Sequence, residues 1–203
     1  MGLKECFEAY GLVCRIADLL SECCSKSKLP SSAVLIAAVS RRLGMPLEGA
    51  EKIVEKYYRN ELTVEEVKTI LDGLENLVND GRVEEEARKV VEERIVKAIK
   101  EKGEDWVVAA LFDGSLGYHT PSHARRLIKR FMEGHRKDWC ERCLSVFDSK
   151  LDVMMYADIT GFERIERRDP EKVRKLIELV REVEKLDQVD QIGIGLMYPS
   201  MGV

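Results

Sequence analysis

Histidine and cysteine residues that could bind a metal ion gather in one short stretch of the chain. All three histidines and the only Cys-x-x-Cys pair fall between residues 119 and 143, in the order His119, His123, His135, Cys140 and Cys143. Imidazole nitrogens and thiolates are ligands that tetrahedral zinc prefers, and a structural zinc site takes four of them. We therefore expect a zinc ion held by His119, His123, Cys140 and Cys143, with His135 as an alternative ligand.

The same residues leave other interpretations open. The histidines beside the arginine-rich segment could be ordinary surface residues, and a free cysteine packs as a small apolar side chain. A zinc ion with three protein ligands and a water molecule would be catalytic instead of structural. In that case His119, His123 and Asp113 could form a metal-dependent hydrolase, joined by Asp158 if the fold brings it near.

The order His-x3-His followed by Cys-x2-Cys resembles the N-terminal zinc domain of retroviral integrases. The resemblance covers about 25 residues, from His119 to Cys143. It implies a small helical unit held together by a structural zinc ion. The resemblance implies the types of ligand and a structural role for the metal. It does not imply integrase activity.

Cationic residues are concentrated in the same stretch. From Pro121 to Cys143 there are seven lysines and arginines and three carboxylates, a net charge of +4, although the whole chain carries −4. On a helix predicted from about Pro121 to Glu133, Arg126, Lys129 and Arg130 share a face. Because such cations neutralise phosphates, we expect the chain to bind nucleic acid, RNA in preference to DNA. The residues expected to do so are Arg125, Arg126, Lys129, Arg130, Arg136 and Lys137.

Two other interpretations of this basic segment involve no nucleic acid. The cations could form a solvated helix face that makes ion pairs with the acidic helix predicted around Glu84 to Glu93. They could instead dock on an acidic protein, which would make the chain a non-catalytic subunit of a larger assembly.

The spacing Arg130-x4-His135 resembles the catalytic motif of HEPN-type ribonucleases, which are helical proteins. The resemblance implies that Arg130 stabilises the charge of the transition state and that His135 transfers a proton. His135 would then be a catalytic residue and not a zinc ligand. The two candidate catalytic residues on this reading are Arg130 and His135.

Helices account for most of the elements that the sequence predicts. Apolar residues recur at helical spacing from Leu3 to Ser25, and further helices follow, the second ending at Gly44 and the fourth beginning at a capping box on Thr63. The span from Ser31 to Lys56 resembles a helix-turn-helix, and the residues around Gly81 resemble the helix end before the wing of a winged-helix domain. We expect a helical bundle over residues 1–103, in which this span forms either a corner of the bundle or a helix-turn-helix. A second domain is expected over 104–203.

The C-terminal part is predicted to contain a small α/β element. Leu151 to Tyr156 and Gln191 to Met197 have the apolar character of buried strands, and a helix beginning at Pro170 lies between them. A strand, a helix and a strand in this order indicate a right-handed parallel crossover. The predicted fold class is therefore mostly α, with an N-terminal helical bundle and a C-terminal strand-helix-strand element.

The composition restricts the class of protein. Of the 203 residues, 45% are hydrophobic and 34% are charged, which excludes a disordered chain and does not fit a membrane protein. The abundance of Glu, Lys and Arg is typical of thermostable proteins. Six cysteines are too few for a disulfide scaffold, and the N-terminus carries no signal-peptide pattern. We expect a cytoplasmic protein.

Overall fold

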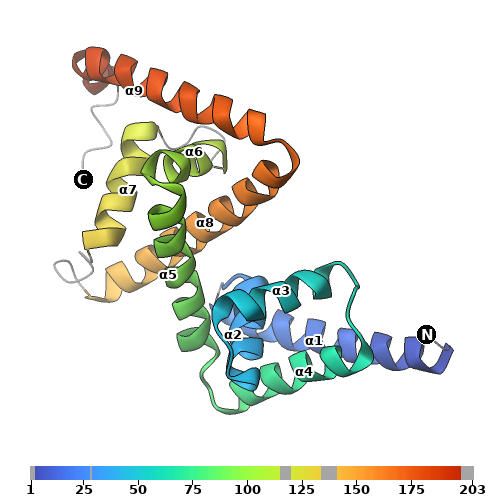
Figure 1. The fold of residues 1–203 in the computed structure, drawn as a ribbon. Helices are drawn as coiled ribbons and strands as arrows, with labels where there is room; N and C mark the ends of the chain where they lie inside the picture. The colour runs from blue at the N-terminus through green and yellow to red at the C-terminus, as the bar shows by residue number, and fades with distance from the viewer. Residues whose placement is uncertain (1–2, 28, 115–119, 134–140, 198–203) are drawn as a thin grey trace. The chain divides into compact units, whose positions relative to one another are not determined.

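The computed structural model describes residues 3–27, 29–114, 120–133 and 141–197, with side chains described at 7–25, 29–114, 120–133 and 151–186. In these residues every regular element is an α-helix (Figure 1). The chain divides into two compact units, Met1–Glu93 and Arg94–Val203. The division falls inside helix α5 (Val83–Lys102), on the N-terminal side of the domain seam expected at Gly103.

The first unit is built around helix α2 (Ser31–Leu43), in which all seven residues from Ala33 to Val39 are buried. Helices α3 (Leu47–Tyr58) and α4 (Val64–Asn79) pack against α2, and α1 (Leu3–Ser27) packs against α4. The α2–α4 contact is close at Gly73, where a Cβ atom would lie 2.6 Å from the carbonyl oxygen of Ala38. Only glycine therefore allows the two backbones to approach in this way.

The predicted ends of these helices are confirmed. Helix α2 ends at Gly44, which has a φ of 61° in the left-handed region that glycine adopts at low cost. Helix α4 begins at Thr63, whose hydroxyl accepts from the Glu66 N–H while the Glu66 carboxylate accepts from the Thr63 N–H. Helices α2 and α3 thus follow one another through a short turn. After Gly81 the chain enters α5 at Val83, and no wing strand is formed there.

The second unit surrounds helix α6 (Glu104–Gly114) with α7 (Pro121–Glu133), α8 (Glu141–Arg168) and α9 (Pro170–Met197). The apolar run at residues 106–111, whose periodicity fits either a strand or a helix, is helical and buried on all sides. A helix that is hydrophobic all round needs neighbours on every face. The rings of Trp106 and Phe162 meet edge to face at 5.0 Å between centroids, which joins α6 to α8.

The predicted strand-helix-strand element is wrong. Leu151–Tyr156 lies in the middle of α8, and Gln191–Met197 forms the last turns of α9. Helix α8 has no proline, and its buried residues Met155, Ile159 and Phe162 follow the helical spacing i, i+4, i+7. The short window 151–156 hides this period. In α9 no glycine or proline interrupts the chain between Pro170 and Gly193, so the helix continues into the second predicted strand.

Candidate nucleic-acid interface

Helix α7 forms where the sequence predicts it and presents three cations to solvent. Pro121 occupies its first position, and the Thr120 hydroxyl accepts a hydrogen bond from the His123 N–H at 3.3 Å. Its buried residues are Pro121, Ala124, Leu127 and Ile128. The opposite face carries Arg126, Lys129 and Arg130, all exposed. We call these three residues the basic edge.

The basic edge is mostly open to new partners. Lys129 lies 3.7 Å from the Glu133 carboxylate, and its side chain remains 73% exposed. Among the side chains that the structure describes, no carboxylate pairs with Arg126 or Arg130. Such solvated cations are free to exchange water and small ions for phosphate oxygens.

Arg125 does not belong to this edge. Its guanidinium points toward α6 and α9, where Nη2 donates to Asp105 at 2.6 Å and to Glu184 at 2.8 Å, and Nη1 donates to Glu104 at 3.1 Å. These carboxylates raise the pKa of the guanidinium above its usual value, led by Glu184. Arg125 is thus a structural ion-pair centre, and phosphate would have to displace three carboxylates to reach it.

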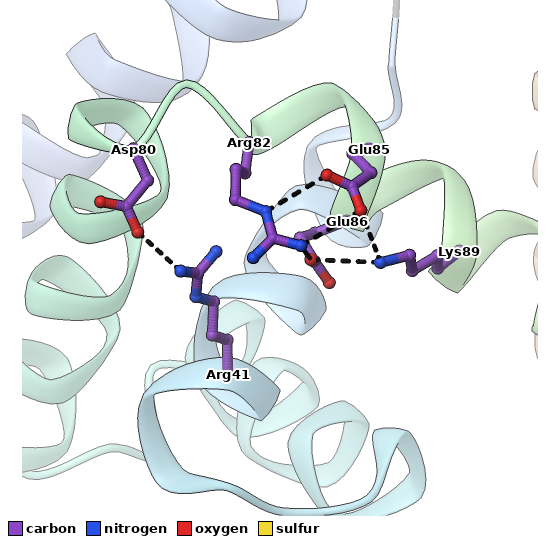
Figure 2. Close-up of polar contacts among 6 residues, drawn as sticks. All are labelled: Arg41, Asp80, Arg82, Glu85, Glu86 and Lys89. Atoms are coloured by element: carbon purple, nitrogen blue, oxygen red, sulfur yellow. Dashed lines mark hydrogen bonds and ion pairs between the residues drawn. The ribbon is translucent and has the colours of Figure 1, made fainter.

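Carboxylates in the first turn of the acidic helix α5 pair with cations close to them in the sequence. Figure 2 shows that Arg82 contacts both Glu85 and Glu86, and that Lys89 contacts the same two carboxylates. In the same view Arg41 of α2 pairs with Asp80 at 2.6 Å. The arginine and lysine neighbours lower the pKa of Glu85 to about 2. The described partners of Arg125, Glu104, Asp105 and Glu184, all lie in its own unit.

The charge of the two units differs. Residues 1–93 contain thirteen cationic and eighteen acidic residues, a net charge of −5, whereas residues 94–203 contain twenty and nineteen, a net charge of +1. The basic edge lies in the less acidic unit. This distribution favours anion binding there over the first unit.

The expected metal ligands fall largely outside the described residues. His119, His135 and Cys140 lie there, as do Arg136 and Lys137, and Cys143 lies in the first turn of α8, where side chains are not described. His123 lies in the first turn of α7. In the described part of the chain no group of three or more His, Cys, Asp or Glu side chains is arranged to hold a metal.

The fold brings Asp113 and Asp158 together. Asp113 is in the last turn of α6, and Asp158 lies on α8 against Gly114. Burial, and then the negative charge of Asp113, raise the pKa of Asp158 to about 6. Two carboxyl groups near one another offer oxygen ligands that can attract a cation. The sequence marks both residues as candidates, but only the packing of α6 on α8 joins them.

The Arg125 centre is the feature that sequence reasoning misses. Arg125 lies among other cations in the sequence, and its strongest partner, Glu184, is 59 residues away. The pattern of charges does not distinguish it from Arg126. The one available signal is the apolar spacing of Ala124, Leu127 and Ile128, which turns Arg125 toward the side of the buried face.

No helix in the described ranges combines the length and apolar character required to cross a bilayer. Comparisons with protein-family models, with curated proteins and with solved structures find no match to this chain.

Proposed function

We propose that this chain binds nucleic acid through the basic edge of α7, with RNA as the preferred ligand. The observation that supports the proposal is the exposure of Arg126, Lys129 and Arg130 on one helix face. The rise from Arg126 to Arg130 is about 6 Å, so the three cations reach neighbouring phosphates of one strand. Contact with about three phosphates gives binding that weakens steeply as salt rises.

The proposal is tested by fluorescence anisotropy with a labelled RNA and a DNA of the same sequence, between about 50 and 200 mM salt. Three contacts predict a slope of log K against log salt of about −2.7 on a duplex and about −2.1 on a single strand. The variant R126Q/K129Q/R130Q should lose salt-dependent binding.

The matched control is K52Q/K56Q/R59Q. It removes the same charge from three exposed cations of the acidic first unit, two on α3 and one at its C-cap. This variant should keep the affinity and the slope of the wild type. Absence of wild-type binding to either nucleic acid, or an equal loss in both variants, would contradict the proposal.

The electrostatic interaction between Asp113 and Asp158 favours a second candidate, a metal-dependent hydrolase. Two adjacent carboxylates supply oxygen ligands of the kind that Mg²⁺ and Mn²⁺ prefer. The test is hydrolysis of bis(p-nitrophenyl) phosphate with added Mn²⁺. Turnover that requires Mn²⁺ and is lost in D113N, but kept in D72N, would support this candidate. Hydrolysis no faster than in buffer without protein would contradict the hydrolase candidate.

A further inference from the structure

Helix α7 packs on its unit through a few buried apolar residues and through an ion-pair network centred on Arg125. Its buried residues are a proline, an alanine, a leucine and an isoleucine. The polar contact is Arg125, which reaches Glu104 and Asp105 on α6 and Glu184 on α9. One side chain on α7 therefore bridges two other helices.

The geometry of this bridge fixes the rotation of α7 about its own axis. The guanidinium is planar, and its Nε and Nη2 both donate hydrogen bonds to the Glu184 carboxylate. Nη1 donates to Glu104 and Nη2 donates to Asp105, both on α6. A planar fork held on two sides allows little rotation. Because Arg126 follows Arg125 by 100° of helix, fixing one residue fixes the direction of the other.

The centre of the bridge is partly protected from solvent. The Glu184 side chain is 17% exposed and that of Arg125 is 31% exposed, so salt screens this pair less than the pairs at the surface. Asp105 also accepts from Arg181 at 2.7 Å. Arg125 and then Arg181 hold the pKa of the Asp105 carboxyl below its usual value. The Asp105 carboxyl and the Arg125 guanidinium therefore stay charged throughout the neutral range.

We propose that Arg125 is a positioning residue for nucleic-acid binding, an inference that rests on the function proposed above. It touches no phosphate itself. It holds α7 at the rotation that turns the basic edge away from the buried face and toward solvent, where all three cations are accessible to phosphates. Without it, α7 rotates or tilts, and fewer cations make contact in any one encounter.

The experiment measures the salt slope and the affinity of R125Q for the same labelled RNA, at a temperature well below the melting midpoint of each variant. Loss of one simultaneous contact should reduce the magnitude of the slope by about 0.7 to 0.9 and the affinity about five- to tenfold at 0.1 M salt. A role in stability alone would lower the melting midpoint and leave the slope unchanged. The R125K variant keeps the charge but not the fork, and should recover only part of the affinity.

Two further variants cover the case in which R125Q does not fold. E184Q weakens the bridge on the α9 side and E104Q on the α6 side, and each should reduce the slope in the same direction. The control is R174Q, which removes an exposed arginine that pairs with Glu171 and Glu178 on α9. It should bind as the wild type does.

The outcomes separate this inference from the proposed function. If the wild type binds RNA and the folded bridge variants keep its slope and affinity, Arg125 has no positioning role and the basic edge still stands. If the wild type binds no nucleic acid, both the proposed function and the positioning role of Arg125 are contradicted. A reduced slope in the bridge variants with an unchanged slope in R174Q supports the inference.

Discussion

The carboxylate of Asp158 lies directly against Gly114, at the point where α6 ends. A Cβ atom on residue 114 would lie 2.2 Å from Oδ1 of Asp158 and 2.9 Å from its Cβ. Side-chain rotation cannot move the Cβ of Asp158, so a larger residue would push α6 and α8 apart. The absence of a side chain at residue 114 is thus a condition of the α6–α8 contact.

Replacement of Gly114 by alanine should therefore destabilise the protein by about 1 to 3 kcal/mol. The matched control is G161A on α8, where a new Cβ would meet nothing within 4 Å. That change should stabilise the protein by up to about 1 kcal/mol, since alanine favours the helix. Urea unfolding followed by circular dichroism measures both, and equal stability of the two variants would contradict the prediction.

Asp158 should also make stability depend on pH. Its pKa is about 6 in the folded chain and 3.8 in an exposed aspartate. The folded state therefore binds the proton more tightly, and the free energy of unfolding falls as pH rises from about 4 to 7. The cost is fully present above pH 6 and absent below pH 4. Allowing for solvent screening of a half-buried group, it amounts to about 1 to 2 kcal/mol.

The D158N variant tests this dependence. It should be more stable than the wild type at pH 7 and should show a flatter profile between pH 4 and 7. D72N, which changes an exposed aspartate on α4 paired with Arg42, is the control and should keep the wild-type slope. A D158N profile parallel to that of the wild type would show that folding does not raise the pKa of the Asp158 carboxyl.

The capping box of α4 makes a local contribution to stability that can be measured within one helix. Thr63 supplies the cap, while Thr69 of the same helix donates to the Glu65 carbonyl. Thr63→Ala should cost about 1 kcal/mol because the Glu66 N–H loses its partner. Thr69→Ala should be neutral or slightly stabilising, since that bond competes with the helix. The prediction fails if both substitutions have the same cost in thermal unfolding.

Sequence reasoning locates helices best where their ends carry chemical signals. Thr120 and Pro121 at the start of α7, and Thr63 at the start of α4, satisfy backbone groups that every helix leaves open. The strands predicted near Leu151 and Gln191 had no such signals, only an apolar run that either structure could bury. Both segments are helical because each continues a longer helix, a period that the short apolar windows do not reveal.

The candidate site divides in the same way. The exposed face of α7 follows from the spacing of Arg126, Lys129 and Arg130, which is a local property. The capture of Arg125 by Glu184 and the meeting of Asp113 with Asp158 depend on contacts between distant parts of the chain. No spacing within one helix contains that information.

The proposed zinc ion has a direct test in the metal content of the purified protein. One zinc per chain is expected, because His119, His123, Cys140 and Cys143 supply four ligands of the preferred types. The C140S variant should lose it, and C23S, which changes a half-buried cysteine of α1, should not. Plasma mass spectrometry measures both. A wild-type protein without stoichiometric metal would remove zinc from the proposal.

The burial of α6 on every side has a consequence during synthesis. Residues 106–111 leave the ribosome well before Val173 and Val180, the buried residues of α9 that help to cover them. At usual rates of translation the interval is about 3 to 14 s. Helices α7 and α8 emerge earlier and can already pack on α6, but the side of α6 that α9 covers stays exposed until the last helix arrives.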